Sequence, residues 1–194
     1  KRQPQRLGVR CGSKFETGKV PWGRDHDIEG ILLRGAGGFR VDSRVGKHRE
    51  RFGVWQIVGR RLNDGFWEPI QSISPGSQNA VLPTATTFSG KVAVAWEDHS
   101  SEPKRIRVRV WGGDRWGRPG TVSGPSKTSH RPILTAGPEG ELWAFWDRYD
   151  NPDYAIHGRR ITPDPGSIER ISPPGKSSLK PTAVHGSAGG LVVA

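Results

Sequence analysis

Two clusters of charged and aromatic residues directly follow tryptophans in this 194-residue chain. The first cluster is Glu97, Asp98 and His99, and the second is Asp147, Arg148, Tyr149 and Asp150. A polar pair, His130 and Arg131, lies between them in the sequence. Such side chains can hold a sugar, because hydroxyl groups need paired donors and acceptors and sugar rings stack on aromatic rings. These nine residues are therefore candidate ligand-binding residues. The structural alternative is that Glu97 and Asp147 accept hydrogen bonds from loop amides.

The elements that position these residues repeat along the chain. Pro83, Pro132 and Pro181 are spaced by 49 residues, and so are Ser74, Ser123 and Ser172, each of which follows a β-branched residue. The apolar runs 92–96 and 142–146 each end on a tryptophan. A third apolar run, 191–194, matches their first four residues and ends where the next tryptophan would stand. Several residue types therefore share one period, which indicates a repeated structural unit.

Each unit is predicted to contain four short strands. In the unit 83–131 these are 83–88, 91–97, 104–111 and 119–123, separated by turn residues rich in Gly, Ser and Pro. The third strand alternates arginines with Ile106, Val108 and Val110, as the two faces of a strand require. No window shows a sustained helical period. The fold class predicted is an all-β propeller of four-stranded antiparallel blades, because one such sheet cannot bury both of its faces alone.

The whole chain, 1–194, is interpreted as a single propeller domain that forms part of a ring. The predicted blades are 28–82, 83–131 and 132–180, with 1–27 as the last strands of a preceding blade and 181–194 as the first strands of a following one. In the blade 28–82, the predicted strands two to four are 39–43, 54–62 and 67–74, and 40–51 is interpreted as a solvated loop beyond strand two. We expect a piece of a longer chain whose neighbouring blades or domains are its nearest partners.

Composition narrows the classes of function. No apolar run is long enough for a membrane helix. Cys11 is the single cysteine, so no intrachain disulfide forms. Arg24-Asp25-His26-Asp27 lacks partners at the spacing of metal ligands, and neither a metal nor a cofactor is predicted.

The net charge of +11 would attract a polyanionic ligand. A basic stripe along the third strands could bind that ligand. Its residues would be Arg60, Arg105, Arg107, Arg109, Arg159 and Arg160. We favour instead the interpretation that these arginines lie on a partly exposed strand, with their stems over neighbouring blades and their charged heads in water. No nucleic-acid partner is predicted because no nucleic-acid motif occurs.

The repeat resembles those of sialidase-type propellers, above all the degenerate copies in large bacterial extracytoplasmic proteins. The residues that carry the resemblance are the run Gly-x-Val-x-Val-Ala-Trp-Glu-Asp at 90–98, the Arg-rich strand and the later Trp-x-x-Pro. The family's Asp-box turn is approximated at 63–67, 113–116 and 163–166, without its Ser and Thr. The resemblance implies that Asp64 and Asp114 cap these turns and that Trp67 and Trp116 pack into the blades. It also implies a secreted or extracytoplasmic location, although Lys1-Arg2-Gln3-Pro4 shows no apolar leader.

The resemblance is specific for the fold and not for an activity. Sialidase chemistry needs three arginines, a Tyr-Glu nucleophile pair and an acidic Asp. The run Phe39-Arg40-Val41-Asp42 lacks the family's proline, and nothing in the sequence sets Tyr149 beside Glu97 as a nucleophile pair. No catalytic residue is therefore assigned. The sequence predicts a non-catalytic scaffold or recognition module with a glycan or other polyanion as ligand, the alternatives being part of a sialidase-like hydrolase and a basic polyanion-binding module.

Overall fold

The computed structural model describes residues 31–32, 42–49, 55–63, 66–75, 79–186 and 189–194, of which 31–32, 42–49, 62–63 and 66–67 are described by their backbone alone. Every element in these ranges is a β-strand. The first sheet holds β1 (Ile31–Leu32), β2 (Asp42–Arg49), β3 (Trp55–Asn63), β4 (Phe66–Trp67) and β5 (Gln71–Ser72). The second holds β6 (Ala80–Phe88), β7 (Lys91–Asp98), β8 (Arg105–Trp111) and β9 (Gly120–Thr121).

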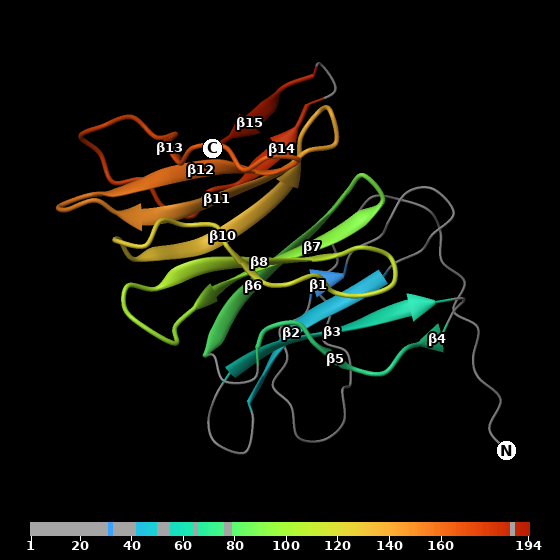
Figure 1. The fold of residues 1–194 in the computed structure, drawn as a ribbon. Coiled ribbons are helices and arrows are strands. Elements are labelled where there is room, and N and C mark those ends of the chain that lie inside the picture. Colours follow the sequence, from blue (N-terminus) through green and yellow to red (C-terminus); the bar gives the residue numbers. More distant parts are fainter. Residues whose placement is uncertain (1–30, 33–41, 50–54, 64–65, 76–78, 187–188) are drawn as a thin grey trace, which may run out of the picture.

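The third sheet holds β10 (Ser129–Ala136), β11 (Leu142–Tyr149), β12 (Tyr154–Thr162) and β13 (Glu169–Arg170), and a hairpin of β14 (Ala183–His185) and β15 (Leu191–Val193) follows. All strand pairs are antiparallel, and the second and third sheets each run in chain order. Figure 1 shows the sheets stacked beside one another in the order of the chain. The predicted all-β class with four-stranded antiparallel sheets is confirmed, and the stacking is that of neighbouring propeller blades.

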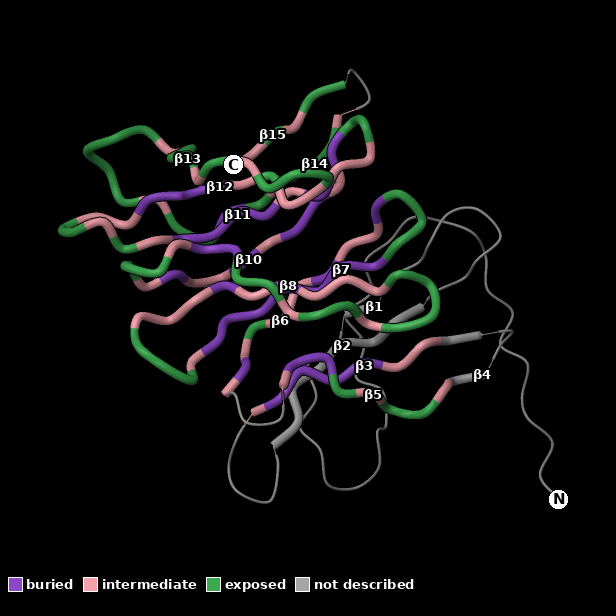
Figure 2. Tube along the Cα trace, viewed as in Figure 1, coloured by how far each residue is buried: buried purple, intermediate pink, exposed green. Residues whose placement is uncertain are grey.

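The cores lie between the sheets. Side chains of β7 alternate between two of them, because successive residues of a strand point to opposite faces. Val92, Val94 and Trp96 pack toward the first sheet with Ile57 and Ile73. On the other face, Ala93 and Ala95 join a cluster with Leu142, Ala144 and Trp146 of β11. Figure 2 shows buried residues running along both β7 and β11. A large residue on one face and alanine on the other thus sets how closely each sheet approaches its two neighbours.

The repeated serines hold the outer strands in register. The hydroxyl of Ser123 accepts a hydrogen bond from the Ile106 amide at 2.9 Å. Ser74 does the same for Ile57 at 2.9 Å, and Ser172 for Ile156 at 3.0 Å. Each bond satisfies a backbone donor in the third strand of its sheet, where the short fourth strand offers no further carbonyl. The 49-residue serine spacing is therefore explained by one repeated contact.

The first sheet departs from the predicted boundaries. Residues 42–49, which belong to the segment predicted as a loop, form β2 and pair with β3 from Asp42 opposite Leu62 to Arg49 opposite Trp55. The charged composition of the segment suggested a solvated loop, but a strand's propensity depends on its neighbours, and β3 supplies a complete partner. The predicted strand two at 39–43 is displaced accordingly, and residues 39–41 lie outside the described ranges.

The predicted strand at 67–74 is split. It appears as β4 and β5, which pair separately with β3. Pro69 lies between them and lacks the N–H that a continuous ladder needs. The strands predicted in residues 1–27 lie outside the described part of the chain.

Candidate functional site

The nine candidate residues lie at one end of the second and third sheets. They come from the ends of β7 and β11, the start of β10 and the adjoining loops. Backbone hydrogen bonds join these loops, since the Ser129 amide donates to the Lys104 carbonyl at 3.0 Å and the Tyr149 amide to the Thr128 carbonyl at 3.3 Å. We call this surface, formed by residues 97–104, 127–131 and 147–154, the loop face. The structure thus brings together two clusters that are 50 residues apart in the sequence.

Glu97 is a buried carboxylate of the loop face with three partners. Its side chain is 2% exposed, and Oε1 accepts a 2.6 Å hydrogen bond from the Arg131 amide. Oε2 lies 2.7 Å from Nε2 of His99 and 3.2 Å from Nδ1 of His130. Burial alone would raise the pKa of Glu97, but the hydrogen bonds from His130, the Arg131 amide and His99 together lower it below its ordinary value of 4.5. Glu97 is therefore an ionised acceptor.

Asp147 has the same place in the next sheet. Its side chain is fully buried and forms an ion pair with the Arg131 guanidinium through Nε and Oδ2. Oδ1 accepts a 2.9 Å hydrogen bond from the Lys180 amide. Burial raises the pKa of Asp147 although Arg131 and the Lys180 amide act to lower it.

The two carboxylates meet amides in an unusual backbone conformation. Arg131 and Lys180 have φ values of 47° and 59°, and Leu82, at the matching position of the preceding sheet, has 50°. Each directly precedes one of the repeated prolines, and the registers of β6 and β10 shift at this point. A left-handed residue costs free energy unless its surroundings hold it. Glu97 and Asp147 supply that support from the preceding sheet, so the proposed loop-amide role is the one that the structure shows.

Asp98 is also engaged locally. Its Oδ1 accepts a hydrogen bond from the Ser100 amide at 2.9 Å, and its Oδ2 lies 3.4 Å from Nε of Arg107. The side chain is 7% exposed. Asp98 is the last residue of β7, and its carboxylate is turned toward β8 and not into solvent.

Asp150 gathers four cationic or imidazole groups. It accepts hydrogen bonds from Arg148 Nε at 2.8 Å, Lys127 Nζ at 3.1 Å and His157 Nε2 at 2.9 Å, and Arg170 Nη1 lies 3.7 Å away. Partial burial acts to raise the pKa of Asp150, but these partners outweigh it and hold the pKa far below its ordinary range. Burial lowers the pKa of His157. The cluster ties the loop after β11 to the neighbouring strands.

Acidification is expected to weaken the fold partly through Asp150. Since its folded-state pKa lies below the ordinary 3.8, its stabilising contribution is complete above that value and is lost as the pH falls below it. Glu97, whose pKa is also lowered, changes the stability of the fold in the same direction. Asp147 has a raised pKa, so its effect is opposite: it favours the folded state most at low pH, and this contribution is lost as the pH rises. Urea midpoints of wild type and Asp150→Asn should therefore differ more at about pH 7 than at about pH 3. An equal difference at both pH values would contradict this assignment.

The groups that the loop face presents to solvent are aromatic and basic. Tyr149 is 42% exposed, and its ring centroid lies 5.2 Å from that of Tyr154. The centroid of the His130 ring lies 6.5 Å from that of Tyr154. Side chains of Arg131, His99 and His130 are 37%, 24% and 21% exposed, respectively. A row of rings next to donors and acceptors can bind an amphipathic ligand such as a sugar.

Some of these residues were missed in the sequence. Tyr154 stands directly opposite Tyr149 across the β11–β12 hairpin, and that pairing could have pointed to it once the turn between them was recognised. Lys127, His157 and Arg170 come from three different elements. No sequence spacing links them to Asp150, because only the packing of the sheet brings them together.

The third-strand arginines join neighbouring sheets. Nη1 of Arg109 donates to the Ile73 carbonyl at 2.8 Å, and Nη1 of Arg159 to the Val122 carbonyl at 3.3 Å, each in the preceding sheet. Their Nε atoms donate to carbonyls in the following turn, Gly117 at 2.6 Å and Gly166 at 2.7 Å. These two arginines of the suggested basic stripe therefore have a structural role. They reach the neighbouring sheet, as the interpretation favoured from the sequence expected, but their guanidinium groups bond to carbonyl oxygens, where charged heads in water were expected.

The Asp-box expectation fails at the second turn. Asp114 is exposed and forms no hydrogen bond with the described residues. The turn is closed by its backbone, through the Gly112 amide and Arg115 carbonyl at 3.1 Å, so a carboxylate cap is unnecessary. Trp116 does pack against the core between the first two sheets, as expected. Asp64 and the Trp67 side chain lie outside what the structure describes.

The catalytic arrangement considered from the sequence is not assembled among the described residues. The Tyr149 hydroxyl contacts Asn151 Oδ1 at 3.3 Å, and Glu97 is engaged by His99, His130 and Arg131. Arg40 and the Arg24–Asp27 cluster lie outside the described ranges. Among the residues described, no group of three metal-binding side chains comes together. No helix there is long and apolar enough to cross a membrane.

Comparison with solved structures shows the fold. The chain is similar to an alpha-L-arabinofuranosidase from Fusarium graminearum, solved with an iminosugar inhibitor, with a TM-score of 0.60 and 14% identity over 91% of this chain. A thermostable family-43 glycoside hydrolase aligns over 78% of the chain with a TM-score of 0.49 and 15% identity. The chain spans 60% of the length of each of these two proteins. The likeness to the arabinofuranosidase supports a propeller-type fold.

No protein-family model matches the chain. No curated protein is significantly similar to it in sequence.

Proposed function

We propose that this chain is part of a β-propeller that recognises glycans without cleaving them, and that the loop face is its binding surface. The observation that carries the proposal is a group of rings at the surface, the exposed Tyr149 with the partly exposed Tyr154 and His130, beside the partly exposed Arg131 and His99. A sugar's C–H face packs on such rings while its hydroxyl groups pair with imidazole and guanidinium nitrogens. The fold likeness to an arabinofuranosidase supports a carbohydrate as the ligand class.

Recognition is favoured over hydrolysis by the state of the carboxylates. Glycoside hydrolysis uses a pair of carboxyl groups that face the scissile bond. On the loop face, Glu97, Asp98 and Asp147 are 2%, 7% and 0% exposed, and each already accepts a backbone amide. Asp150 is held by basic partners. Using any of them as an acid or a base would release a contact that holds two elements together.

The proposal places the chain in a larger bacterial protein, secreted or otherwise extracytoplasmic, whose further blades complete the ring. This setting rests on the resemblance to sialidase-type repeats. In such a protein, a sugar-binding surface without a catalytic pair would attach the neighbouring domains to a carbohydrate.

The test is binding of the 194-residue chain to a panel of neutral, carboxylated and sulfated oligosaccharides, measured by isothermal titration calorimetry. Tyr149→Ala is expected to weaken binding about tenfold, the loss of a little over 1 kcal/mol of stacking. Tyr149→Phe should bind nearly as wild type because the ring remains. The matched control is Lys91→Ala, an exposed residue at the other end of β7.

Three outcomes would overturn the proposal. The first is the absence of binding to every oligosaccharide, and the second is release of reducing sugar from a bound one. The third is binding confined to sulfated chains, insensitive to Tyr149→Ala and lost at moderate salt, which would favour the basic polyanion-binding alternative.

A further inference from the structure

Two imidazole rings of the loop face share one oxygen atom. Oε2 of Glu97 lies 2.7 Å from Nε2 of His99 and 3.2 Å from Nδ1 of His130. His99 directly follows β7 of the second sheet, and His130 belongs to β10 of the third. The Glu97 side chain is 2% exposed, whereas those of His99 and His130 are 24% and 21% exposed. A buried carboxylate therefore holds two rings that reach the surface.

The state of Glu97 decides which nitrogen of each ring carries a hydrogen. Burial acts to raise the pKa of Glu97, but its hydrogen bonds lower the pKa below the ordinary value, so the carboxylate is ionised. An ionised carboxylate only accepts hydrogen bonds, and the nitrogens that face it, Nε2 of His99 and Nδ1 of His130, must donate. In a neutral imidazole the other nitrogen is then an acceptor. Those acceptors are Nδ1 of His99 and Nε2 of His130.

Both acceptor nitrogens are open to solvent. Neither forms a hydrogen bond with the described residues, and neither belongs to the buried nitrogen atoms that lack a partner there. Turning either ring over would break its hydrogen bond with Glu97. The neutral rings can therefore only accept a hydrogen from a ligand, and they cannot adapt to one that needs donors.

The Arg131 guanidinium adds donors beside these acceptors. Its Nε pairs with the buried carboxylate of Asp147, so the charge of Arg131 already has a counterion. Nη1 and Nη2 form no hydrogen bond with the described residues, and the side chain is 37% exposed. A sugar hydroxyl both donates and accepts, so it can use the guanidinium and the imidazoles alike. A carboxylate only accepts, and it would face two nitrogen lone pairs.

We infer that, at neutral pH, the loop face selects neutral sugars over carboxylated ones, because His99 and His130 act there as hydrogen-bond acceptors. Glu97 is the positioning residue that fixes both rings in this role. The inference rests on the proposed function and names the class of glycan that the loop face takes. Acid should shift the selection toward carboxylated sugars, because a protonated imidazole donates through both nitrogens and attracts a carboxylate, whereas a hydroxyl can turn to accept.

Other charged groups near the two rings also respond to pH. Those that the structure shows around the rings are Glu97 on β7, Arg131 on β10 and Asp147 on β11, with Tyr154 of β12 next to His130. Burial raises the pKa of Asp147, and protonation of Asp147 would free Arg131 for an anionic ligand. The test must therefore separate the histidines from Asp147.

Two substitutions remove only the outward nitrogens. His99→Gln places an amide nitrogen where Nε2 stood, and His130→Asn places one where Nδ1 stood, so each keeps a donor for Glu97. The matched control is His185→Gln, an exposed histidine of β14 outside the loop face. Urea midpoints close to that of wild type check that each variant is folded and that the contact with Glu97 is retained.

The experiment titrates the full 194-residue chain with tetrasaccharides of glucose, galactose, glucuronate and galacturonate by isothermal titration calorimetry. Salt at about 0.15 M limits the contribution of exposed lysines. At about pH 8, where imidazoles are neutral, a neutral tetrasaccharide should bind with a dissociation constant of the order of 1 mM and more tightly than its carboxylated counterpart. His99→Gln and His130→Asn should each weaken that binding about fivefold, and His185→Gln should not.

The pH dependence is the second measurement. Between about pH 8 and about pH 5, the ratio of neutral to carboxylated affinity should fall about tenfold in wild type and in His185→Gln, because the carboxylated sugar gains charge-assisted hydrogen bonds. The ratio should change little in the double variant His99→Gln/His130→Asn, which has no imidazole to protonate at these positions.

Several results would overturn the inference. Tighter binding of the carboxylated tetrasaccharides at pH 8 would do so and leave the proposed function standing, as would neutral binding that both substitutions leave unchanged. A pH-dependent ratio that persists in the double variant would assign the effect to Asp147. Absence of binding to all four tetrasaccharides would also end the inference, and the proposed function fails with it only if the wider panel of oligosaccharides gives no binding either.

Discussion

Asp147→Ala is expected to lower the free energy of unfolding by about 3 kcal/mol. The Asp147 side chain is fully buried, pairs with the Arg131 guanidinium of the neighbouring strand β10, and accepts the Lys180 amide from the segment before β14. Truncation strands the Lys180 amide, a loss of about 1–3 kcal/mol, and removes a charge-assisted hydrogen bond. The Arg131 side chain is 37% exposed and can hydrate its free charge, so the loss falls at the lower end of the 3–5 kcal/mol typical of broken buried pairs.

The measurement is urea denaturation of wild type, Asp147→Ala and the matched control Asp114→Ala. Asp114 is exposed and without a hydrogen bond to the described residues, so its truncation should change the free energy of unfolding by less than about 0.5 kcal/mol. Asp147→Asn should fall between wild type and alanine, because an amide oxygen still accepts from Lys180 but carries no charge for Arg131. A loss for Asp147→Ala no larger than that of the control would show that the carboxylate does not hold β10 and the segment before β14 in place.

Trp146→Ala is expected to cost about 3–5 kcal/mol. Trp146 is 0% exposed and belongs to the cluster between the second and third sheets, with Ala95 and Leu142 among its members. Truncation removes the largest side chain of that core and leaves a cavity that the surrounding strands cannot fill, because their backbones are fixed by ladders on both sides. Nε1 of Trp146 has no hydrogen-bond partner within the described structure, so the loss is one of packing.

The matched control is Trp143→Ala on the same strand. Trp143 points to the opposite face of β11, is partly exposed and stacks on Phe145 with centroids 6.1 Å apart. Its loss should be about 1–2 kcal/mol, from stacking and partial burial. Thermal and urea unfolding of both variants measure the difference. Equal losses for the two tryptophans would mean that the cluster containing Trp146 is not the main core between these sheets.

Much of the fold could be predicted because its packing repeats. The same few contacts recur within each sheet and between neighbouring sheets, so the residues that make them recur at one spacing. The serines that accept third-strand amides and the tryptophans that fill the cores are examples. Predictions were wrong where a local rule was overridden. The charged segment of β2 became a strand because β3 offered it a partner, and Asp114 was not needed as a cap because backbone atoms close its turn.

The candidate site was predicted in its members but not in their roles. Residue type showed that Glu97 and Asp147 could bind either a ligand or an amide. The choice depended on the left-handed conformation of Arg131 and Lys180, which turns each amide toward the carboxylate of the preceding sheet. Tyr154 escaped notice because its neighbour Tyr149 lies across a hairpin and not at a repeat distance.

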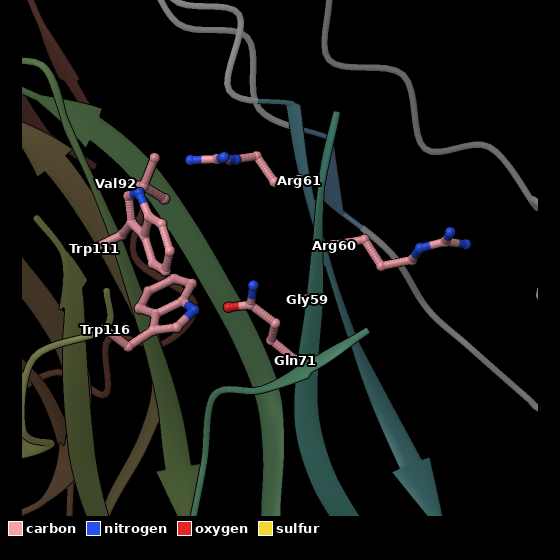
Figure 3. A pocket seen from close by; sticks show the side chains of 7 residues that line it. All are labelled: Gly59, Arg60, Arg61, Gln71, Val92, Trp111 and Trp116. Atoms are coloured by element: carbon pink, nitrogen blue, oxygen red, sulfur yellow. The ribbon is translucent and has the colours of Figure 1, made fainter. Parts of the chain in front are cut away.

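The sequence by itself determined the four-stranded unit and the residues that face each core, since both follow from periods of 49 and of two residues. Tertiary structure alone decided which carboxylates are committed to amides and cations and which side chains remain for a ligand. It also made the small hollow beside Trp111 and Trp116, whose walls come from the first and second sheets (Figure 3). The physical reason is that periodicity records contacts repeated in every sheet, whereas a surface for a ligand is made of the side chains left over when those contacts are complete.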